Sequence, residues 1–330
     1  MKVYVDAACD IKYASFYVEG IRRFTGGMPQ FTSSYFGQFE LNNHYFPLVV
    51  AHQNGLSKII IDFADGWSID SKAYEWCDLY AKVNIDFADA DRYEKLFSIG
   101  PSFGIRTFSP VGTVFYSIVN FLKAKHRIPN TKTFFANYNS QRLRFSIGHY
   151  RNDKKSSNDY VFFASSLWKS EPETNAFRAN FIRACQKILG PNFEGGFAPR
   201  TRNDVPGYED LTLSGRIGES EYFDKLRDSM AVFNTPAVLQ CHGWKLGEFM
   251  ALNKAIISTP LARKLPKNLV DGEDFLLTDG TQSDMEHKIR LLLDNPELKV
   301  KLERASIAYY NDFVAPEKVI SLIFGQLGIK

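Results

Sequence analysis

The sequence predicts an α/β protein with two Rossmann-like domains that face each other across a cleft. Short apolar strands rich in β-branched residues alternate with helical segments along the chain, which is typical of parallel sheets covered by helices on both faces. A polar stretch at residues 149–160 interrupts the pattern, which then restarts. The length of 330 residues fits two domains of about 150 residues each.

The first half is expected to begin with the strand KVYV and to alternate from there. The strand KIIIDFAD, at residues 58–65, is a β-branched run that ends in acids. In such folds ligands bind at the carboxyl ends of the strands, so these acids are candidate site residues. The expected elements are a strand at 2–5, a helix at 16–24, a strand at 58–65, a helix at 71–77, and strands at 78–85 and 94–101.

The second half repeats the alternation and ends in helices. Ser283 is expected to cap one helix, and Pro296 and Pro316 suit the first turns of the last two. The expected elements are a strand at 160–166, a helix at 175–189, strands at 193–197 and 231–238 around a helix at 220–230, a helix from 243 or 244, a strand at 254–258, and helices at 284–295, 296–313 and 316–329.

Composition narrows the class of protein. Apolar residues make up 45% of the chain and charged residues 23%, a balance that excludes a disordered chain. The four cysteines form no CxxC pair, so a reducing cytoplasm is the expected location. The start lacks the pattern of a signal peptide.

Residues 106–155 carry ten Lys or Arg and one acid, whereas the remainder has a net charge of −6. This local excess of positive charge favours binding to an anionic surface or an anionic substrate over binding to nucleic acid.

The segment HGWKLGEFMALNKAII, residues 242–257, has features of a ligand site. A helix that begins near Gly243 presents free N–H groups and a partial positive charge. Lys245 adds a full positive charge in the first turn, which suits an anion bound there. Glu248 lies on the same stripe as Trp244, where a carboxylate can accept hydrogen bonds from adjacent hydroxyls. Asn253 is expected to end the helix in a left-handed conformation.

The longer segment NTPAVLQCHGWKLGEFMALNKAIISTPLARKLPKNLVDGEDFLL resembles the donor-binding domain of GT-B glycosyltransferases. It is most similar to the group 1 and group 4 type of bacterial enzymes that build surface polysaccharides. GEFMALNKAIIS matches the family's nucleotide-sugar segment, with Asn253 for the usual Gly and Ala255 for the usual Pro. The resemblance covers the chain from about residue 160 onward and is specific over residues 213–277.

The resemblance implies a role for each matched residue. Glu248 falls on the family's ribose-binding glutamate, and Gln240 replaces a second glutamate near the sugar. LSGRIGESEYFDKL resembles the loop and helix that hold the base, through Arg216 and Ile217. Lys169 and Arg178 follow the strand after which the family often supplies diphosphate-binding cations. The predicted donor-binding residues are Glu248, Lys245, Gly243, Trp244, Leu246, His242, Gln240, Arg216, Ile217 and Lys169.

The resemblance also implies a division of the chain. We expect an N-terminal acceptor-binding domain at residues 1–155, a nucleotide-sugar-binding domain at 156–314, and a C-terminal helix at 315–330 that packs back toward the N-terminal domain. Catalytic groups are expected from the first domain: Asp65 is the leading candidate for a base, Asp62 and Asp10 follow it, and Lys82 is expected to orient acceptor or phosphate.

The predicted activity is metal-independent transfer of a sugar from a nucleotide-sugar to a glycan or lipid-linked glycan. No cofactor is expected besides this co-substrate. Asp89 and Asp91 form an Asp-x-Asp pair, which we assign to the start of a helix rather than to a metal site. An anionic membrane surface is a further expected partner of residues 106–155. The alternative is a non-catalytic sugar-nucleotide-binding protein of the same fold. Nucleic-acid binding is disfavoured, because no nucleic-acid motif accompanies the basic stretch.

Overall fold

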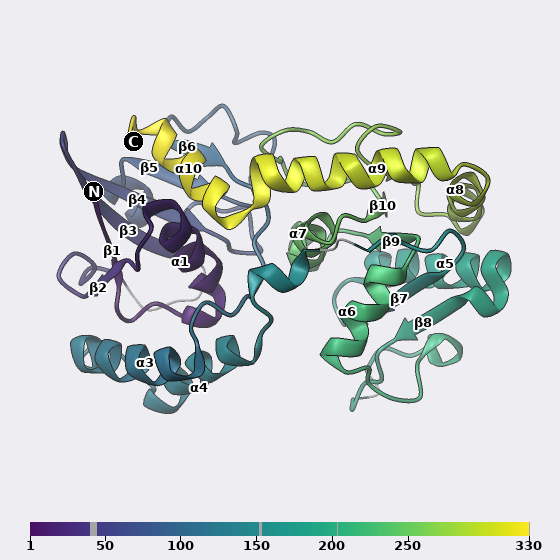
Figure 1. The fold of residues 1–330 in the computed structure, drawn as a ribbon, viewed down its shortest axis with the longest axis horizontal. Coiled ribbons are helices and arrows are strands. Elements are labelled where there is room, and N and C mark those ends of the chain that lie inside the picture. The colour runs from purple at the N-terminus through teal and green to yellow at the C-terminus, as the bar shows by residue number, and fades with distance from the viewer. Residues whose placement is uncertain (40–44, 152–153, 203, 330) are drawn as a thin grey trace. The chain divides into compact units, whose positions relative to one another are not determined.

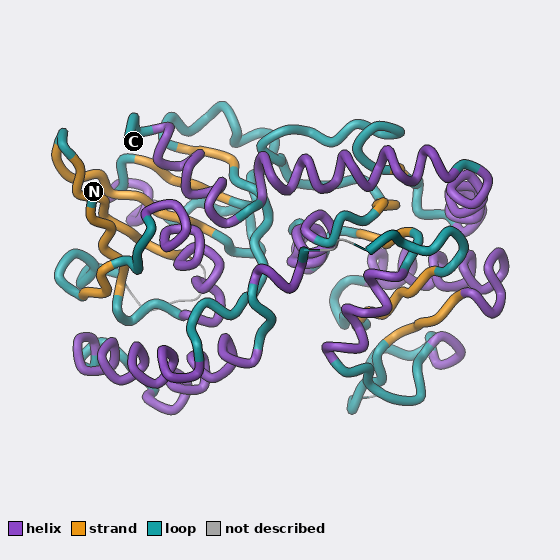
Figure 2. Tube along the Cα trace, in the orientation of Figure 1, coloured by secondary structure: helices purple, strands orange, loops and turns teal. Residues whose placement is uncertain are grey.

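The computed structural model describes residues 1–39, 45–151, 154–202 and 204–329. Its contacts divide the chain into two compact units. Unit 1 contains Met1–Tyr150, Arg263–Lys267 and Asn311–Lys330, and unit 2 contains Arg151–Ala262 and Asn268–Tyr310. Strands and helices alternate in both (Figure 2), as the sequence predicts for an α/β fold.

Unit 1 is built on a six-stranded sheet with the order β2-β1-β3-β4-β5-β6. Strand β3 runs antiparallel to both of its neighbours, and the other pairs are parallel. The sheet is therefore mixed rather than wholly parallel. The strands are β1 (Lys2–Asp6), β2 (Gln30–Thr32), β3 (Tyr45–His52), β4 (Gly55–Asp62), β5 (Leu79–Lys82) and β6 (Leu96–Ser98).

The β3–β4 hairpin was not predicted, although its turn has a clear sequence signal. His52 pairs with Gly55 across a two-residue turn, and Gly55 has a φ of 126°. Asn-Gly between two apolar runs is a strong hairpin signal, because glycine adopts positive φ without steric cost. The expected helix after Asp89 is absent from the described residues, where residues 87–92 form turns instead.

Five α-helices lie among the described residues of unit 1. Asp10 caps α1, and its carboxylate accepts a hydrogen bond from Lys12 N at 3.0 Å. Helix α10 packs against α1 (Figure 1). At this contact a Cβ on Gly20 would lie 2.3 Å from the carbonyl oxygen of Pro316. The helices are α1 (Ile11–Thr25), α2 (Ser71–Trp76), α3 (Pro110–Ala124), α4 (Thr131–Leu143) and α10 (Pro316–Gln326). The helices α3 and α4 were not predicted.

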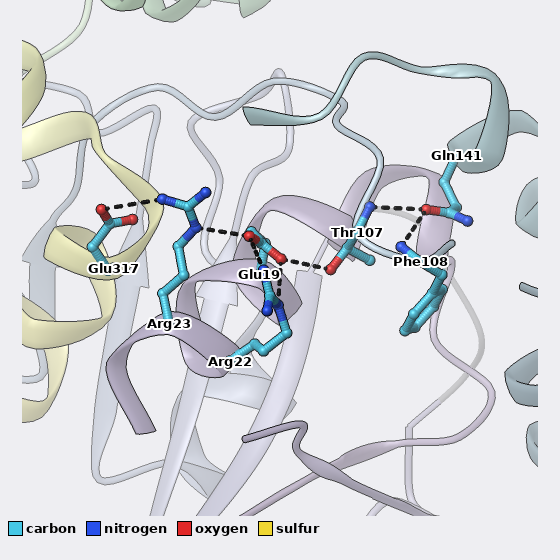
Figure 3. Close-up of polar contacts among 7 residues, drawn as sticks. All are labelled: Glu19, Arg22, Arg23, Thr107, Phe108, Gln141 and Glu317. Carbon is cyan, nitrogen blue, oxygen red and sulfur yellow. Dashed lines mark hydrogen bonds and ion pairs between the residues drawn. The ribbon is translucent and has the colours of Figure 1, made fainter. Parts of the chain in front are cut away.

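A buried carboxylate joins several parts of unit 1 (Figure 3). Glu19 on α1 accepts hydrogen bonds from Arg22, Arg23 and the hydroxyl of Thr107. Burial alone would raise the pKa of Glu19, but these hydrogen bonds outweigh it, so the pKa is lowered. Gln141 on α4 accepts from the backbone N–H groups of Thr107 and Phe108. The network fixes α4 and the loop at residue 107 relative to α1.

Unit 2 has parallel strands throughout. Strand β7 pairs with β8, and β10 pairs with both β9 and β11. Strand β7 also lies beside β9, where the rings of Phe163 and Phe233 are 5.7 Å apart in the core. The strands are β7 (Val161–Ser165), β8 (Phe193–Phe197), β9 (Ala231–Asn234), β10 (Ala255–Ser258) and β11 (Leu276–Leu277).

The helices of unit 2 follow the predicted order. They are α5 (Pro172–Leu189), α6 (Glu219–Asp228), α7 (Gly243–Ala251), α8 (Gln282–Asp294) and α9 (Pro296–Tyr309). Asn253 ends α7 with a φ of 56°, which confirms the prediction for this residue. Thr281 caps α8, so the prediction of Ser283 as the cap was wrong. Among the described residues, no helix combines the length and apolar character needed to cross a membrane.

We predict that Gly20→Ala destabilises the protein, because the new methyl group would overlap backbone atoms of Pro316. Overpacking of this kind costs about 1–3 kcal/mol. Chemical denaturation monitored by circular dichroism measures the free energy of unfolding. Gly37→Ala is the matched control, because a Cβ there meets no atom within 4 Å. Equal stability of the two variants would contradict the close α1–α10 packing.

Candidate functional site

The carboxyl ends of the parallel strands of unit 2 gather polar side chains at one edge. Ser165 ends β7, Asn234 ends β9, and Ser258 and Thr259 lie at the end of β10. The amide of Asn234 donates to the Ser258 hydroxyl at 2.9 Å. The buried hydroxyls of Ser165 and Thr259 make no hydrogen bond with the described part of the chain. Buried hydroxyls without a partner are uncommon, and here they lie where α/β folds bind ligands.

Two cationic side chains converge on the end of β7. Arg178, from α5, donates from Nη1 to the carbonyl oxygen of Ser166 at 2.7 Å. Lys245, from α7, donates from Nζ to the carbonyl oxygen of Ala164 at 2.6 Å. The Lys245 ammonium also lies 5.8 Å from the ring centroid of Phe163 and 5.3 Å from that of Tyr222. The predicted site residue Lys245 therefore lies against the strand end and two aromatic rings.

Burial of the two cations disfavours their charged forms, as their lowered pKa values show. Burial, with the charge of Arg178 as a second cause, lowers the pKa of Lys245 to about 8, although Glu248 acts in the opposite direction. Burial also lowers the pKa of Arg178 to about 10, against the raising effects of Glu171 and Tyr222. Both cations are held where water stabilises them poorly, so an anion that reached them would be bound favourably.

Glu248 belongs electrostatically to the same cluster. It is partly exposed on α7, one turn after Trp244. Burial raises the pKa of Tyr222, and the charge of Glu248 adds to that rise. The cluster thus combines two cations and a carboxylate with the phenol of Tyr222, a partly exposed residue. Tyr222 was not predicted as a site residue, because an aromatic residue on an amphipathic helix is usually a core residue.

The approach to α7 has an unusual backbone. Leu239, Gln240 and Gly243 have φ values of 55°, 59° and 67°, in the left-handed region. Such a conformation costs free energy at residues with a side chain, and strained backbone of this kind clusters at functional sites. Gln240 is exposed, whereas His242 and Leu246 are buried and Gly243 and Trp244 are partly exposed. Of these donor-site candidates, Gln240 is the one most open to solvent.

The remaining predicted donor residues lie on loops of unit 2. Arg216 is exposed and Ile217 partly exposed in the loop before α6. Lys169 is exposed after β7. The pKa of Asp204 is lowered first by hydrogen bonding to Arg200 and also by the charge of Lys169. A cavity of about 230 Å³ lies in this region, lined by Leu167, Ala198, Arg200, Arg202, Val205, Tyr208, Glu209 and Thr212.

The predicted catalytic residues of unit 1 have different environments. Lys82 is fully buried, and its Nζ lies 2.6 Å from Asp62, which also accepts a hydrogen bond from Tyr80 at 2.7 Å. This ion pair fixes both side chains within the sheet. Asp65 is exposed in the loop after β4. Asp10 is the α1 cap, and burial raises its pKa. The catalytic roles of Asp65, Lys82 and Asp10 stay predictions.

Unit 1 also has a pocket of about 850 Å³ between the β2 region and α3. It combines aromatic side chains with hydroxyl and basic groups, and Asn120 on its wall has a buried Oδ1 without a hydrogen-bond partner in the described ranges. The lining residues are Tyr4, Pro29, Gln30, Phe31, Thr32, Ser33, Ser34, Phe115, Tyr116, Val119, Asn120, Lys123 and His126. No cluster of three or more potential metal ligands occurs among the residues that the structure describes.

Among known proteins, the chain is similar to solved structures. No protein-family model matches the chain, and no curated protein matches it. The C-terminal domain of the glycosyl transferase group 1 family protein LpcC from Francisella tularensis is 20% identical, with a TM-score of 0.34 over 48% of this chain and 88% of that one.

Two further solved structures carry UDP. S. aureus MnaA with UDP is 15% identical, with a TM-score of 0.43 over 99% of this chain and 96% of that one. Anabaena HepE with UDP is 10% identical, with a TM-score of 0.41 over 76% and 72%. These likenesses assign no function to this chain.

We predict that anion affinity of unit 2 falls as pH rises through about 8, because Lys245 then loses its charge. Sulfate is a suitable probe, since its own charge is constant in this range. Between pH 7 and pH 9 its affinity should fall about threefold to tenfold. Calorimetric titration at a series of pH values measures this.

Two variants isolate the contribution of Lys245. Lys245→Met should weaken sulfate binding and remove the pH dependence. Lys254→Met is the control: burial lowers the pKa of Lys254 to about 8 as well, but Lys254 precedes β10, at the opposite end from Ser258. If Lys254→Met removed the pH dependence and Lys245→Met kept it, the assignment of the anion site to α7 would be wrong.

Proposed function

We propose that the chain is a GT-B glycosyltransferase and that unit 2 binds its nucleotide-sugar donor. The observation that carries the proposal is the pair of poorly solvated cations, Arg178 and Lys245, at the carboxyl end of β7. Sugar transfer from a nucleotide donor releases a diphosphate, on which negative charge develops. Cations held in place before the reaction stabilise that charge without reorganising.

Glu248 supports the assignment of the ligand as a nucleotide rather than a simple phosphate. It lies on the same helix as Lys245 and within electrostatic reach of it. A carboxylate accepts hydrogen bonds from the two adjacent hydroxyls of a ribose, whereas it repels a free phosphate. In this arrangement, Lys245 and Arg178 bind the diphosphate and Glu248 binds the ribose. Arg216, Ile217 and the loop around them are the proposed contacts of the base.

The proposal includes a glycan or lipid-linked glycan as acceptor, in capsule, lipopolysaccharide or exopolysaccharide synthesis, at the inner face of the plasma membrane. Asp65 is the proposed base, since it is the exposed carboxylate at the end of β4. The two cations take the charge-stabilising part that a divalent metal plays in other transferases, so transfer is proposed to be metal-independent.

One observation favours the second candidate function, a non-catalytic sugar-nucleotide-binding protein. Where the resembling family has a carboxylate near the sugar, this chain has Gln240, which is exposed and uncharged. A binding protein needs the cations and Glu248 but no group that acts on the sugar. The glycosyltransferase and the binding protein would therefore share the same donor site, but only the transferase would turn over its nucleotide-sugar.

We predict that Glu248→Ala weakens UDP binding about 10-fold to 100-fold, because hydrogen bonds to a charged group contribute about 1.5–3 kcal/mol. Isothermal titration calorimetry measures the Kd. Glu248→Gln should retain part of the affinity, and Glu297→Ala, which removes an exposed acid from α9, should leave it unchanged. Unaltered affinity in folded Glu248→Ala would contradict the ribose contact.

Activity separates the two candidate functions. We predict that the protein slowly hydrolyses one member of a panel of nucleotide-sugars, selected by thermal shift, and that hydrolysis persists when a chelator is present. Release of nucleoside diphosphate is the readout, and Lys245→Met should abolish it. Binding without any hydrolysis or transfer would favour the non-catalytic protein, and complete loss of activity with chelator would contradict metal independence.

A further inference from the structure

The helix α3 is oriented with its polar face toward the protein. Its buried side chains are Thr113, Ser117, Asn120 and Ala124, three of which are polar. Asn120 Nδ2 donates to the hydroxyl of Tyr138 at 2.8 Å, and Gln141 Nε2 donates to the hydroxyl of Thr113 at 3.0 Å. Tyr138 and Gln141 belong to α4, so hydrogen bonds hold α3 against α4.

The opposite face of α3 is apolar and exposed. Five large apolar side chains on it are between 49% and 80% exposed: Val111, Val114, Phe115, Ile118 and Leu122. Their spacing of three, four, seven and eleven residues from Val111 places them on one stripe of the helix. A helix at a protein surface normally has the reverse orientation, with its apolar stripe toward the core. A contiguous exposed apolar stripe usually marks an interaction surface.

The sequence segment that contains this stripe, which we call the α3 stripe, is basic. Residues 106–150 contain seven Lys or Arg and neither Asp nor Glu. Arg127 pairs with the buried Asp6 at 2.9 Å, and Lys123 donates to the carbonyl oxygen of Phe31, so both hold the structure together. Arg106, Lys125 and Lys132 are exposed. The apolar stripe is thus accompanied by positive charge without any acid in the same segment.

We infer that α3 lies in the surface of an anionic lipid bilayer, with the α3 stripe among the acyl chains and the exposed basic residues at the head groups. Interfacial helices combine an apolar face with Lys and Arg in this way. A second copy of the chain is a poorer occupant, because two acid-free basic segments would meet and repel each other. An anionic bilayer supplies both the apolar phase and the opposite charge.

The pocket of unit 1 suits this position. Phe115 belongs to the α3 stripe and lines the pocket, together with the hydroxyl groups of Thr32, Ser33 and Ser34. A bilayer against α3 would therefore also contact one wall of this pocket, at Phe115. The inference about α3 does not depend on the donor site, so either can fail without the other.

Vesicle flotation tests the inference directly. The full chain should float with vesicles of phosphatidylcholine and phosphatidylglycerol, and less with phosphatidylcholine alone. The variant Val111→Gln, Val114→Gln, Ile118→Gln, Leu122→Gln should bind at least about tenfold more weakly. These four side chains are exposed and none lines the pocket, so the variant should keep its fold, which circular dichroism checks.

A matched variant controls for the loss of apolar surface. Leu56→Gln with Val270→Gln removes exposed apolar side chains elsewhere and should bind vesicles as the unchanged protein does. Lys125→Glu with Lys132→Glu should weaken binding to anionic vesicles, and raising the salt from about 0.1 M to 1 M should do the same.

Depth of insertion separates a lipid surface from other occupants. Ile118→Trp should show fluorescence quenching by brominated lipids beyond that of the unchanged protein, whereas Leu56→Trp should show none beyond it. Equal vesicle binding by the four-Gln variant would overturn the inference. The inference would also be overturned, in favour of a second copy of the chain, by two results together. The protein would not bind vesicles, and it would form a dimer that replacement of the α3 stripe abolishes.

Discussion

The site in unit 2 depends on one constraint: two positive charges are held where water solvates them poorly. Arg178 and Lys245 each donate a hydrogen bond to a backbone carbonyl oxygen at the end of β7, which does not neutralise their charge. Glu171 and Glu248 offset the cost of burial only in part, because the pKa values of both cations stay lowered. These incompletely offset charges are the physical basis of the anion affinity proposed for this site.

The side chains at the carboxyl ends of parallel strands decide where such a constraint can act. In unit 2 the paired strands are parallel, so their carboxyl ends share one edge, and hydroxyls there remain available. In unit 1 the strands β4 and β5 place Asp62 opposite Lys82 in register, and the two charges neutralise each other within the sheet. Equivalent positions at strand ends thus form the proposed binding edge in unit 2 and a buried ion pair in unit 1.

The sequence predicted the α/β class, and it predicted unit 2 more fully than unit 1. The segment from β9 through α7 to β10 was recognisable because Gly243, Asn253 and the apolar strand each report local backbone conformation. The β3–β4 hairpin was missed because no strand was predicted at residues 45–52, although the dipeptide Asn54-Gly55 is a sequence signal for a turn. Tyr222 was missed because it approaches Lys245 and Glu248 only in the folded structure, where α6 and α7 come together. Helical periodicity in the sequence does not reveal a contact of this kind.

The case of α3 shows why periodicity alone leaves function undecided. A stripe of Val, Phe, Ile and Leu at helical spacing predicts an apolar face but does not say whether protein or another phase covers it. The orientation of α3 is determined by its opposite face, where Thr113 and Asn120 form hydrogen bonds with residues on α4. Reversing the helix would bury the stripe and expose groups that water can satisfy. It would also break those two hydrogen bonds and deprive the Tyr138 hydroxyl and the Gln141 Nε2 of their partners on α3. The polar contacts therefore fix the orientation, and the apolar stripe faces outward as a consequence.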